Sequence, residues 1–195
     1  MRVITMNCPD CGAPVSIGDK ECAYCGSSII ITSFSAVSGI EAGKLNSYIS
    51  NYQEMLKTNP DNNQLNLSTA FCYLQLKIYD KALFYFERAI QDNFRNSETF
   101  FYAAVCLLNG KKAFLTRRET INKIETYINA ARSTENRGIY AYFHAYIKYD
   151  YFKRKSLITE PQYMTLLEEA QRLGVSEYDI KSLYSLLNVE RPEAL

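Results

Sequence analysis

The most constraining feature of this chain is a doubled Cys-x-x-Cys motif close to its N-terminus. Cys8 and Cys11 form the first copy, and Cys22 and Cys25 form the second, with ten residues between the two copies. Each copy presents two thiolates on one side of a tight turn, and a tetrahedral Zn²⁺ ion needs four such ligands at about 2.3 Å. The spacing therefore predicts that these four cysteines bind one zinc ion.

Disulfide bonds and redox chemistry are the alternatives for these cysteines. Disulfides are typical of exported chains, and the first residues lack the apolar stretch of a signal peptide; a redox motif needs no second copy at this distance. Four thiolates leave no position for water on zinc, so we expect a structural site. Gly12 and Gly26 follow the two copies, where a positive φ angle suits the turn, and we expect a short hairpin over residues 13–21.

Residues 7–29, with a Cys-x-x-Cys-Gly in each copy, resemble the short zinc-ribbon domains found at the ends of many bacterial and archaeal proteins. The resemblance implies a small folding unit with a docking surface, and some members of the family bind nucleic acid. Residues 1–32 carry two basic and three acidic residues, and a zinc–tetrathiolate centre adds about two negative charges, so this surface repels phosphate. We therefore expect the ribbon to contact protein rather than nucleic acid.

Beyond the ribbon, the pattern changes to that of helices. Residues 33–43 contain several serines and glycines and are expected to be a linker, and from Lys44 onward apolar residues recur at intervals of three and four. The expected organisation is a zinc ribbon (1–32), a linker (33–43) and a helical domain (44–195). Helices are expected over 44–58, 63–76, 80–93, 97–108, 138–151 and 159–173. Two further helices are expected to begin at capping boxes, one formed by Thr116 and Glu119 and the other by Ser176 and Asp179.

The second and third of these helices resemble one tetratricopeptide repeat (TPR), a helix-turn-helix unit of about 34 residues that stacks into a superhelix. The family has a small residue midway along its first helix and an Ala-aromatic-Ala pattern along its second; here these places hold Ala70 and then Ala82, Phe86 and Ala89. Ala104 occupies the place of Ala70 in a second unit. The resemblance implies a mostly α fold: a TPR-like α-solenoid of about three helical hairpins plus a capping helix, with a small N-terminal β zinc ribbon. A compact bundle with accidental periodicity is the alternative.

In TPR arrays, residues of the first helices line a concave groove that binds a segment of another protein. The resemblance places six apolar side chains in this groove: Leu67, Phe71, Leu74, Phe101, Val105 and Leu108. An apolar groove favours an amphipathic helix or an extended apolar segment as its partner. The alternative is that these side chains close a core or are covered by residues 29–40 of the chain itself.

Basic residues gather in the expected turns between the helices of each hairpin. Seven of them form a candidate basic edge: Lys111, Lys112, Arg117, Arg118, Lys153, Arg154 and Lys155. The whole chain has a net charge of only +1, so an acidic partner would be attracted by this edge and not by the protein as a whole. The alternative is that these cations are solvated and offset the helix dipoles.

The sequence offers little catalytic equipment. It contains one histidine, and no paired carboxylates, nucleophile with a base or open metal site can be assembled from spacing. We therefore expect a non-enzymatic protein–protein interaction adaptor or scaffold without a small-molecule substrate; the alternative is a nucleic-acid-associated factor that uses the ribbon and the basic edge. No apolar run is long enough to cross a membrane, and we expect a cytoplasmic protein.

Overall fold

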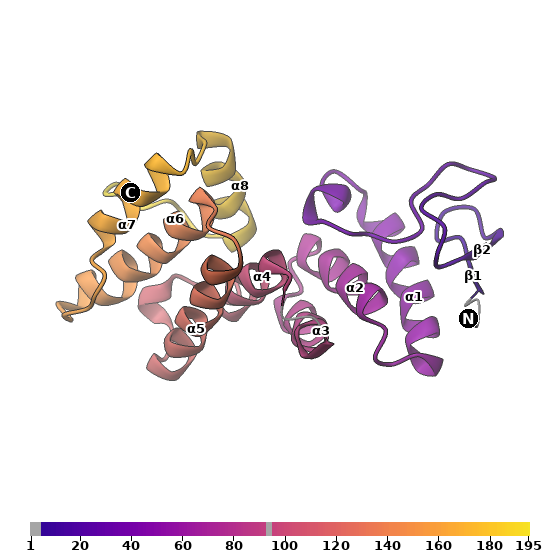
Figure 1. Cartoon of the computed structure of the whole chain (residues 1–195), viewed down its shortest axis with the longest axis horizontal. Coiled ribbons are helices and arrows are strands. Elements are labelled where there is room, and N and C mark those ends of the chain that lie inside the picture. Colours follow the sequence, from indigo (N-terminus) through magenta and orange to yellow (C-terminus); the bar gives the residue numbers. More distant parts are fainter. Residues whose placement is uncertain (1–4, 93–94) are drawn as a thin grey trace. The chain divides into compact units, whose positions relative to one another are not determined.

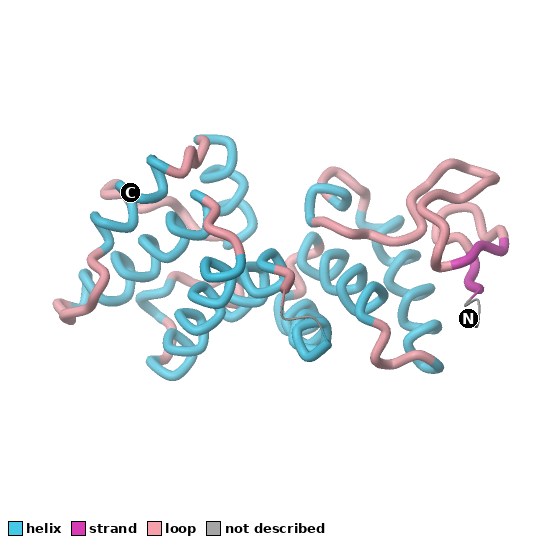
Figure 2. Tube along the Cα trace, in the orientation of Figure 1, coloured by secondary structure: helices cyan, strands magenta, loops and turns pink. Residues whose placement is uncertain are grey.

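The computed structural model describes residues 5–92 and 95–195 of the chain. Over these residues the protein has eight α-helices and one two-stranded sheet (Figures 1 and 2). It divides into two compact units, residues 1–93 and 94–195. The boundary between them falls within the range expected to be a single helical domain, and each unit is described by itself below.

The first unit combines the cysteine segment with three helices. Strands β1 (Thr5–Asn7) and β2 (Pro14–Ser16) pair antiparallel with Met6 opposite Val15. Helix α1 packs against α2, and α2 packs against α3. The bounds of these helices are Ala42–Thr58 for α1, Asn63–Gln75 for α2 and Tyr79–Asp92 for α3, and the expected end of the third helix at Asn93 lies outside the described residues.

The short hairpin expected over residues 13–21 is replaced by one whose two strands lie on either side of the first cysteine motif. Strands β1 and β2 flank the first motif, so that its turn is the end of the hairpin. Around the second motif, Glu21 forms a β-bridge with Ser28 in the same manner. The reason is that each Cys-x-x-Cys turn itself reverses the chain, which brings the residues on its two sides together for pairing.

Residues 29–37 pack on the helices of the first unit, although their serines suggested a linker from Ser33 onward. Ile29, Ile31 and Val37 are buried, and residues Phe34–Val37 form a short 3₁₀-helix. The hydroxyl of Tyr52 on α1 donates a hydrogen bond of 2.8 Å to the carbonyl of Ile29. This cover explains why α2 is buried on nearly every side, from Leu65 to Leu74, instead of showing one polar face.

The second unit consists of helices α4 to α8. Helix α4 packs against α5, α6 packs against α7, and α8 contacts both α4 and α6. Helix α6 continues through a π-helical turn, Lys148–Phe152, and a 3₁₀ turn, Lys153–Lys155. The five helices span Ser97–Leu107 (α4), Arg118–Thr134 (α5), Gly138–Ile147 (α6), Tyr163–Arg172 (α7) and Glu177–Leu187 (α8).

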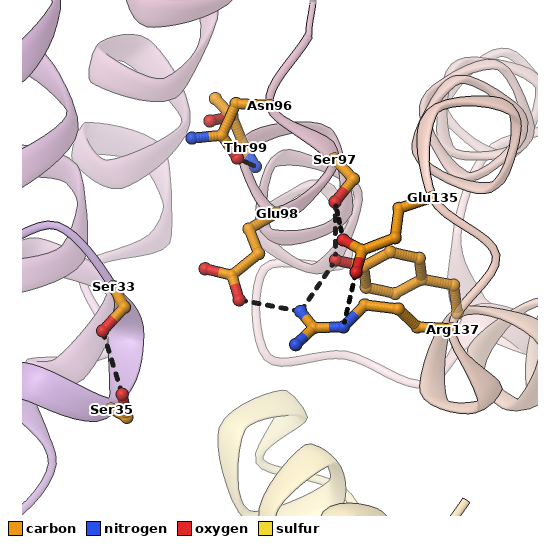
Figure 3. Close-up of polar contacts among 9 residues, drawn as sticks. Ser33, Ser35, Asn96, Ser97, Glu98, Thr99, Glu135 and Arg137 are labelled. Atoms are coloured by element: carbon orange, nitrogen blue, oxygen red, sulfur yellow. Dashed lines mark hydrogen bonds and ion pairs between the residues drawn. The ribbon is translucent and has the colours of Figure 1, made fainter. Parts of the chain in front are cut away.

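Polar contacts hold the ends of these helices together. Arg137, directly before α6, forms ion pairs with Glu98 of α4 at 2.8 Å and with Glu135 after α5 at 3.6 Å (Figure 3). The capping box of Ser176 and Asp179 at the start of α8 is confirmed, with both hydrogen bonds present.

The capping box expected at Thr116 and Glu119 is wrong. Helix α5 begins at Arg118, and Arg117, which precedes it, makes no capping hydrogen bond with its side chain. The Thr116 hydroxyl instead donates to the carbonyl of Lys112 at 3.3 Å. The 3₁₀ turn over residues 113–115 sets where the chain enters α5, so Thr116 is not at the position that caps the helix.

The small residues singled out in the sequence lie where helices touch. Ala70, Ala82, Ala89 and Ala104 are all buried, with at most 2% of their surface exposed. No α-helix in the described part of the chain is long and apolar enough to span a membrane.

Candidate metal centre and basic surface

The four cysteines of the doubled motif converge on one point in the first unit. Their sulfur atoms all lie within 4.8 Å of one another. Cys8 Sγ is 3.6 Å from Cys25 Sγ, and Cys11 Sγ is 3.7 Å from Cys22 Sγ. A tetrahedral centre with metal–sulfur bonds of about 2.3 Å has sulfur–sulfur edges of about 3.8 Å, so the set has the size needed to bind one metal ion.

Disulfide bonds do not explain this cluster. A disulfide joins its sulfurs at about 2.05 Å, much shorter than the separations in the cluster, and all four of its cysteines are free. Each close pair also joins one motif to the other, so a shared ion would connect both turns.

Glycine closes both turns, as the sequence predicts. Gly12 and Gly26 have φ angles of +76° and +73°, in the left-handed region that favours glycine. The N–H of Gly12 donates to the carbonyl of Cys8 at 2.9 Å, and the N–H of Gly26 donates to the carbonyl of Cys22 at 2.8 Å. The two motifs therefore have the same backbone hydrogen bond and bring their sulfurs to the cluster in equivalent ways.

Burial and hydrogen bonding differ within each motif. Cys8 and Cys22 are buried, whereas Cys11 and Cys25 are exposed. A hydrogen bond from the backbone N–H of Ser27 lowers the pKa of Cys25 to about 6. A backbone hydrogen bond from Ala13 acts in the same direction on Cys11, but hydrogen bonds with the other cysteine sulfurs and burial outweigh it and raise the pKa of Cys11 to about 12.

The cysteine cluster is attached to the N-terminal half of α1. The hydroxyl of Ser47 donates to the carbonyl of Pro9 at 2.7 Å, and the hydroxyl of Tyr48 donates to the carbonyl of Ser28 at 3.1 Å. Pro9 lies inside the first motif and Ser28 follows the second, so one helix holds both turns.

Asp10 adds a charged contact to this attachment. Its carboxylate accepts a hydrogen bond from the hydroxyl of Ser27 and lies 2.9 Å from the amine of Lys44 on α1. The bond from Ser27, followed by that from Lys44, lowers the pKa of Asp10. Asp10 therefore joins the first motif to the second motif and to the helix.

The six residues predicted to line a groove are buried and are distributed over both units. In the first unit, the ring of Phe71 has its centre 6.4 Å from that of Phe34 and 5.5 Å from that of Phe86. Phe34 belongs to residues 29–40, so its contact with Phe71 agrees with the alternative in which this segment covers the predicted groove. The buried set is Leu67, Phe71 and Leu74 in the first unit and Phe101, Val105 and Leu108 in the second.

Phe101 likewise packs inside the second unit. The centre of its ring is 4.7 Å from that of Tyr140 and 5.6 Å from that of Phe143, both on α6. These contacts are those of a core residue. A partner groove at these six residues stays a prediction, and in the first unit it would require residues 29–40 to move.

The structure brings the two basic segments of the second unit together. The N–H of Phe114 donates to Asp150 Oδ2 at 2.8 Å, and the guanidinium of Arg154 lies 4.5 Å from the centre of the Phe114 ring. The guanidinium of Arg118 lies 4.7 Å from the centre of the Phe152 ring. Residues 111–118 therefore lie against residues 148–155, and the seven predicted cations belong to one surface, which we call the basic surface.

The cations of this surface fall into two groups. Arg154 pairs with Asp150 at 2.5 Å, Arg118 covers the Phe152 ring, and the Lys155 amine is 3.8 Å from the centre of the Tyr151 ring. The other four cations are exposed and have no ion-pair partner among the described residues: Lys111, Lys112, Arg117 and Lys153.

The second unit contains a partly buried charged network that the sequence did not predict. The Lys148 amine pairs with Glu125 at 2.5 Å, and His144 Nε2 lies 3.5 Å from the same carboxylate. Arg132 contacts His144 Nδ1 at 3.0 Å and pairs with Glu169 at 2.6 Å. The network connects α5, α6 and α7, and the only local signal was that His144 and Lys148 are four residues apart on a strongly apolar helix.

Burial and pairing set the ionisation of this network. Burial opposes the charge on Glu125, but hydrogen bonds from His144 and Lys148 outweigh that effect and lower the pKa of Glu125. Burial lowers the pKa of His144. Each acid of the network thus faces at least one base, which is typical of a structural contact between helices.

No protein-family model matches the chain, and no curated protein matches it significantly. Within the described residues, Cys8, Cys11, Cys22 and Cys25 form the one group of three or more metal-binding side chains close enough to share an ion. The cysteine cluster and the basic surface are therefore the two features from which a function can be argued.

Proposed function

We propose that this protein is a non-enzymatic adaptor that binds an acidic segment of another protein at its basic surface. Its cysteine cluster serves as a structural zinc ribbon, and its helices form TPR-like hairpins. The observation that carries the proposal is that four exposed cations, with no ion-pair partner among residues 5–92 and 95–195, lie on a surface which buried Asp150 holds in place.

The donor set supports zinc as the metal. Four thiolates in a tetrahedral arrangement suit Zn²⁺ or an iron–sulfur centre, and zinc is the ion that such paired turns bind most often in small structural domains. All four positions would be filled by protein, so no site remains for water or substrate. The hydrogen bonds from α1 to both turns support a role in which the ion fixes the N-terminal segment on the helices.

The helical pairs support the TPR-like assignment at the level of single hairpins. Helices α2 and α3, α4 and α5, and α6 and α7 pack as pairs. Ala70 in α2, Ala104 in α4 and Ala145 in α6 are each fully buried. Small buried residues at one place in successive first helices are what close helix packing in such repeats requires.

The basic surface supports an acidic protein segment as the partner. Lys111, Lys112 and Arg117 come from one connection and Lys153 from another, and the contacts of Phe114 keep these connections together. Cations fixed in this way lose less freedom on binding than cations on mobile side chains of an unanchored loop. Leu115, whose surface is 70% exposed, adds an apolar contact beside these charges.

The alternative partner is nucleic acid, which the number of cations favours. Single-stranded nucleic acid usually stacks its bases on exposed aromatic rings. The rings on this surface are engaged: Tyr151 and Phe152 are buried, and Arg154 and Lys155 lie over Phe114. The surface thus offers charge without a stacking platform, which favours a protein partner.

Two fluorescent probes of equal charge test this proposal on the full-length, zinc-loaded protein. One is a peptide rich in Asp and Glu that contains leucines, and the other is a random-sequence DNA oligonucleotide. We expect the peptide to bind more tightly and to lose at least about tenfold in affinity in the double variant Lys111→Glu, Arg117→Glu. Tighter binding of the DNA, with a steep dependence on salt, would support the nucleic-acid alternative instead.

A further inference from the structure

A pocket opens beside the basic surface, in the connection between α6 and α7. Its volume is about 400 Å³, which lies within the range of about 300–1,000 Å³ seen for ligand pockets. The connection is the orange segment between these two helices in Figure 1. Its lining combines basic, neutral polar and apolar side chains: Lys148, Lys153, Ser156, Thr159, Gln162, Leu157, Ile158, Tyr163 and Met164.

The walls of the pocket are held by hydrogen bonds to the helical turns before it. The Lys148 amine donates to Thr159 Oγ1 at 2.8 Å and to the carbonyl of Glu160 at 3.2 Å. The N–H of Leu157 donates to the carbonyl of Phe152 at 2.9 Å. The pocket is thus anchored on Lys148, which is itself buried and paired with Glu125.

The lining of the pocket is mixed, with polar side chains beside large apolar ones that are exposed. Ile158 is 99% exposed, Met164 is 57% exposed and Leu157 is 43% exposed. Three large apolar side chains around one opening form a patch of the kind that marks an interaction site more often than scattered single residues do.

The two lysines that line the pocket indicate which chemical groups an occupant should carry. The amine of Lys148 already has Glu125, Thr159 and Glu160 as partners, so the interior of the pocket offers no free cation. Lys153 lines the same pocket, belongs to the basic surface and has no ion-pair partner in the described part of the chain. An occupant should therefore place an apolar group against the exposed Leu157, Ile158 and Met164 and be acidic where it passes Lys153.

We infer that this pocket receives one large apolar side chain of the acidic protein segment that binds the basic surface. The inference rests on the proposed function and adds the apolar anchor that the partner segment must carry. The acidic residues of the segment lie along Lys153 and the neighbouring cations, and the anchor fills the space between Leu157, Ile158 and Met164.

A library of random peptides displayed on phage tests the inference with the full-length, zinc-loaded protein as bait. We expect the enriched peptides to combine several acidic residues with one recurrent large apolar residue. In a synthesised enriched peptide, replacing that residue by serine should weaken binding about tenfold in a titration. The variant Ile158→Asp should lose the preference for the apolar residue, whereas Lys153→Glu should weaken both the original peptide and its serine version.

The variant Tyr178→Asp is the matched control, because Tyr178 is 77% exposed, lies on α8 and is not part of the pocket. It should bind the enriched peptide as the unmodified protein does. Enriched acidic peptides without a recurrent apolar position, or an apolar preference that survives Ile158→Asp, would overturn the inference and leave the acidic partner in place. If no acidic peptides are enriched, both the inference and the proposed function are wrong.

Discussion

The hydroxyl of Ser68 on α2 is bonded to both backbone groups of Ile31, 37 positions earlier in the chain. It accepts a hydrogen bond from the Ile31 N–H at 3.1 Å and donates one to the Ile31 carbonyl at 2.9 Å. Ser68 is fully buried and Ile31 nearly so. The Ser68 hydroxyl therefore satisfies both backbone hydrogen-bonding groups of Ile31, as a neighbouring strand would in a sheet. These bonds attach the segment that follows the cysteine cluster to α2.

Replacing Ser68 by alanine should destabilise the first unit. The variant leaves the N–H and the carbonyl of Ile31 buried without partners, which costs about 1–3 kcal/mol for each unsatisfied group. Urea unfolding monitored by circular dichroism measures the loss. Ser35→Ala is the control, since the Ser35 hydroxyl is exposed and forms a hydrogen bond with the hydroxyl of nearby Ser33 (Figure 3). Equal stability of the two variants would show that the Ser68 contact is unimportant.

Loss of one cysteine ligand should remove the metal and loosen the N-terminal segment. In Cys22→Ser, three thiolates remain, and the metal no longer joins the two turns. Native mass spectrometry should show one zinc ion in the unmodified protein and none in the variant, and hydrogen exchange should increase over residues 5–31. The control Cys106→Ala removes a buried cysteine of the second unit and should keep its zinc. Zinc retained by Cys22→Ser would contradict the assignment of the site.

Gly138 on α6 should not tolerate a side chain. A Cβ atom there would lie 2.8 Å from the nitrogen of Val175 and 2.9 Å from the carbonyl oxygen of Ala170, and neither backbone atom can move without separating α6 from α7. Overpacking of this kind costs about 1–3 kcal/mol, so Gly138→Ala should lower the unfolding midpoint. Gly43→Ala on α1 meets no atom within 4 Å and should raise stability slightly, because alanine favours helix. The urea midpoint should therefore fall in Gly138→Ala and rise slightly in Gly43→Ala. A change of the same sign in both variants would contradict the prediction.

Acid should destabilise the second unit in two steps. Burial lowers the pKa of His144, so below the unfolded value of about 6.5 the unfolded chain binds a proton that the folded protein does not, and stability falls as the pH decreases. Glu125 has a lowered pKa as well, so its contribution is present above the unfolded value of about 4.3 and is lost as the pH falls further. Arg132 and Lys148 also face His144, and their positive charges oppose its protonation.

Urea midpoints measured from pH 7 to pH 4 check this behaviour. His144→Gln removes the titrating ring and should flatten the curve between about pH 6.5 and pH 5, while the decrease at lower pH should remain. A curve for His144→Gln that matches that of the unmodified protein would assign the first step to another group.

The local pattern of the sequence predicted the helices and the clustering of the four cysteines well, because both depend on residues that are close together in the chain. Apolar spacing alone fixes the amphipathic helices, and the Cys-x-x-Cys turns close through bonds between residues four apart, such as Gly12 N–H to the Cys8 carbonyl. The packing of residues 29–37 was left open by the sequence, which offered cover by residues 29–40 only as an alternative. It depends on Tyr52 and Ser68, whose contacts with Ile29 and Ile31 join distant residues and leave no local pattern.

Asp150 should control the order of the basic surface. It is 1% exposed, accepts a hydrogen bond from the Phe114 N–H and pairs with Arg154, so Asp150→Ala removes the anchor of residues 111–117 and one partner of Arg154. We expect faster hydrogen exchange at Phe114 and a loss of about 1–3 kcal/mol, because a buried N–H is left without an acceptor. Weaker binding of an acidic peptide should accompany both changes, even though the variant makes the protein more positive.

The affinity of Asp150→Ala for an acidic peptide distinguishes two explanations of binding, the fixed arrangement of the cations and the net charge of the protein. If net charge alone decided binding, Asp150→Ala and the control Glu119→Ala would both bind an acidic peptide more tightly, because each removes one negative charge near the same cations. Glu119 is exposed at the start of α5, and the carboxylate that accepts the Phe114 N–H is that of Asp150. Tighter binding in Glu119→Ala together with weaker binding in Asp150→Ala would show that the cations act only when the contact between Phe114 and Asp150 holds them in place.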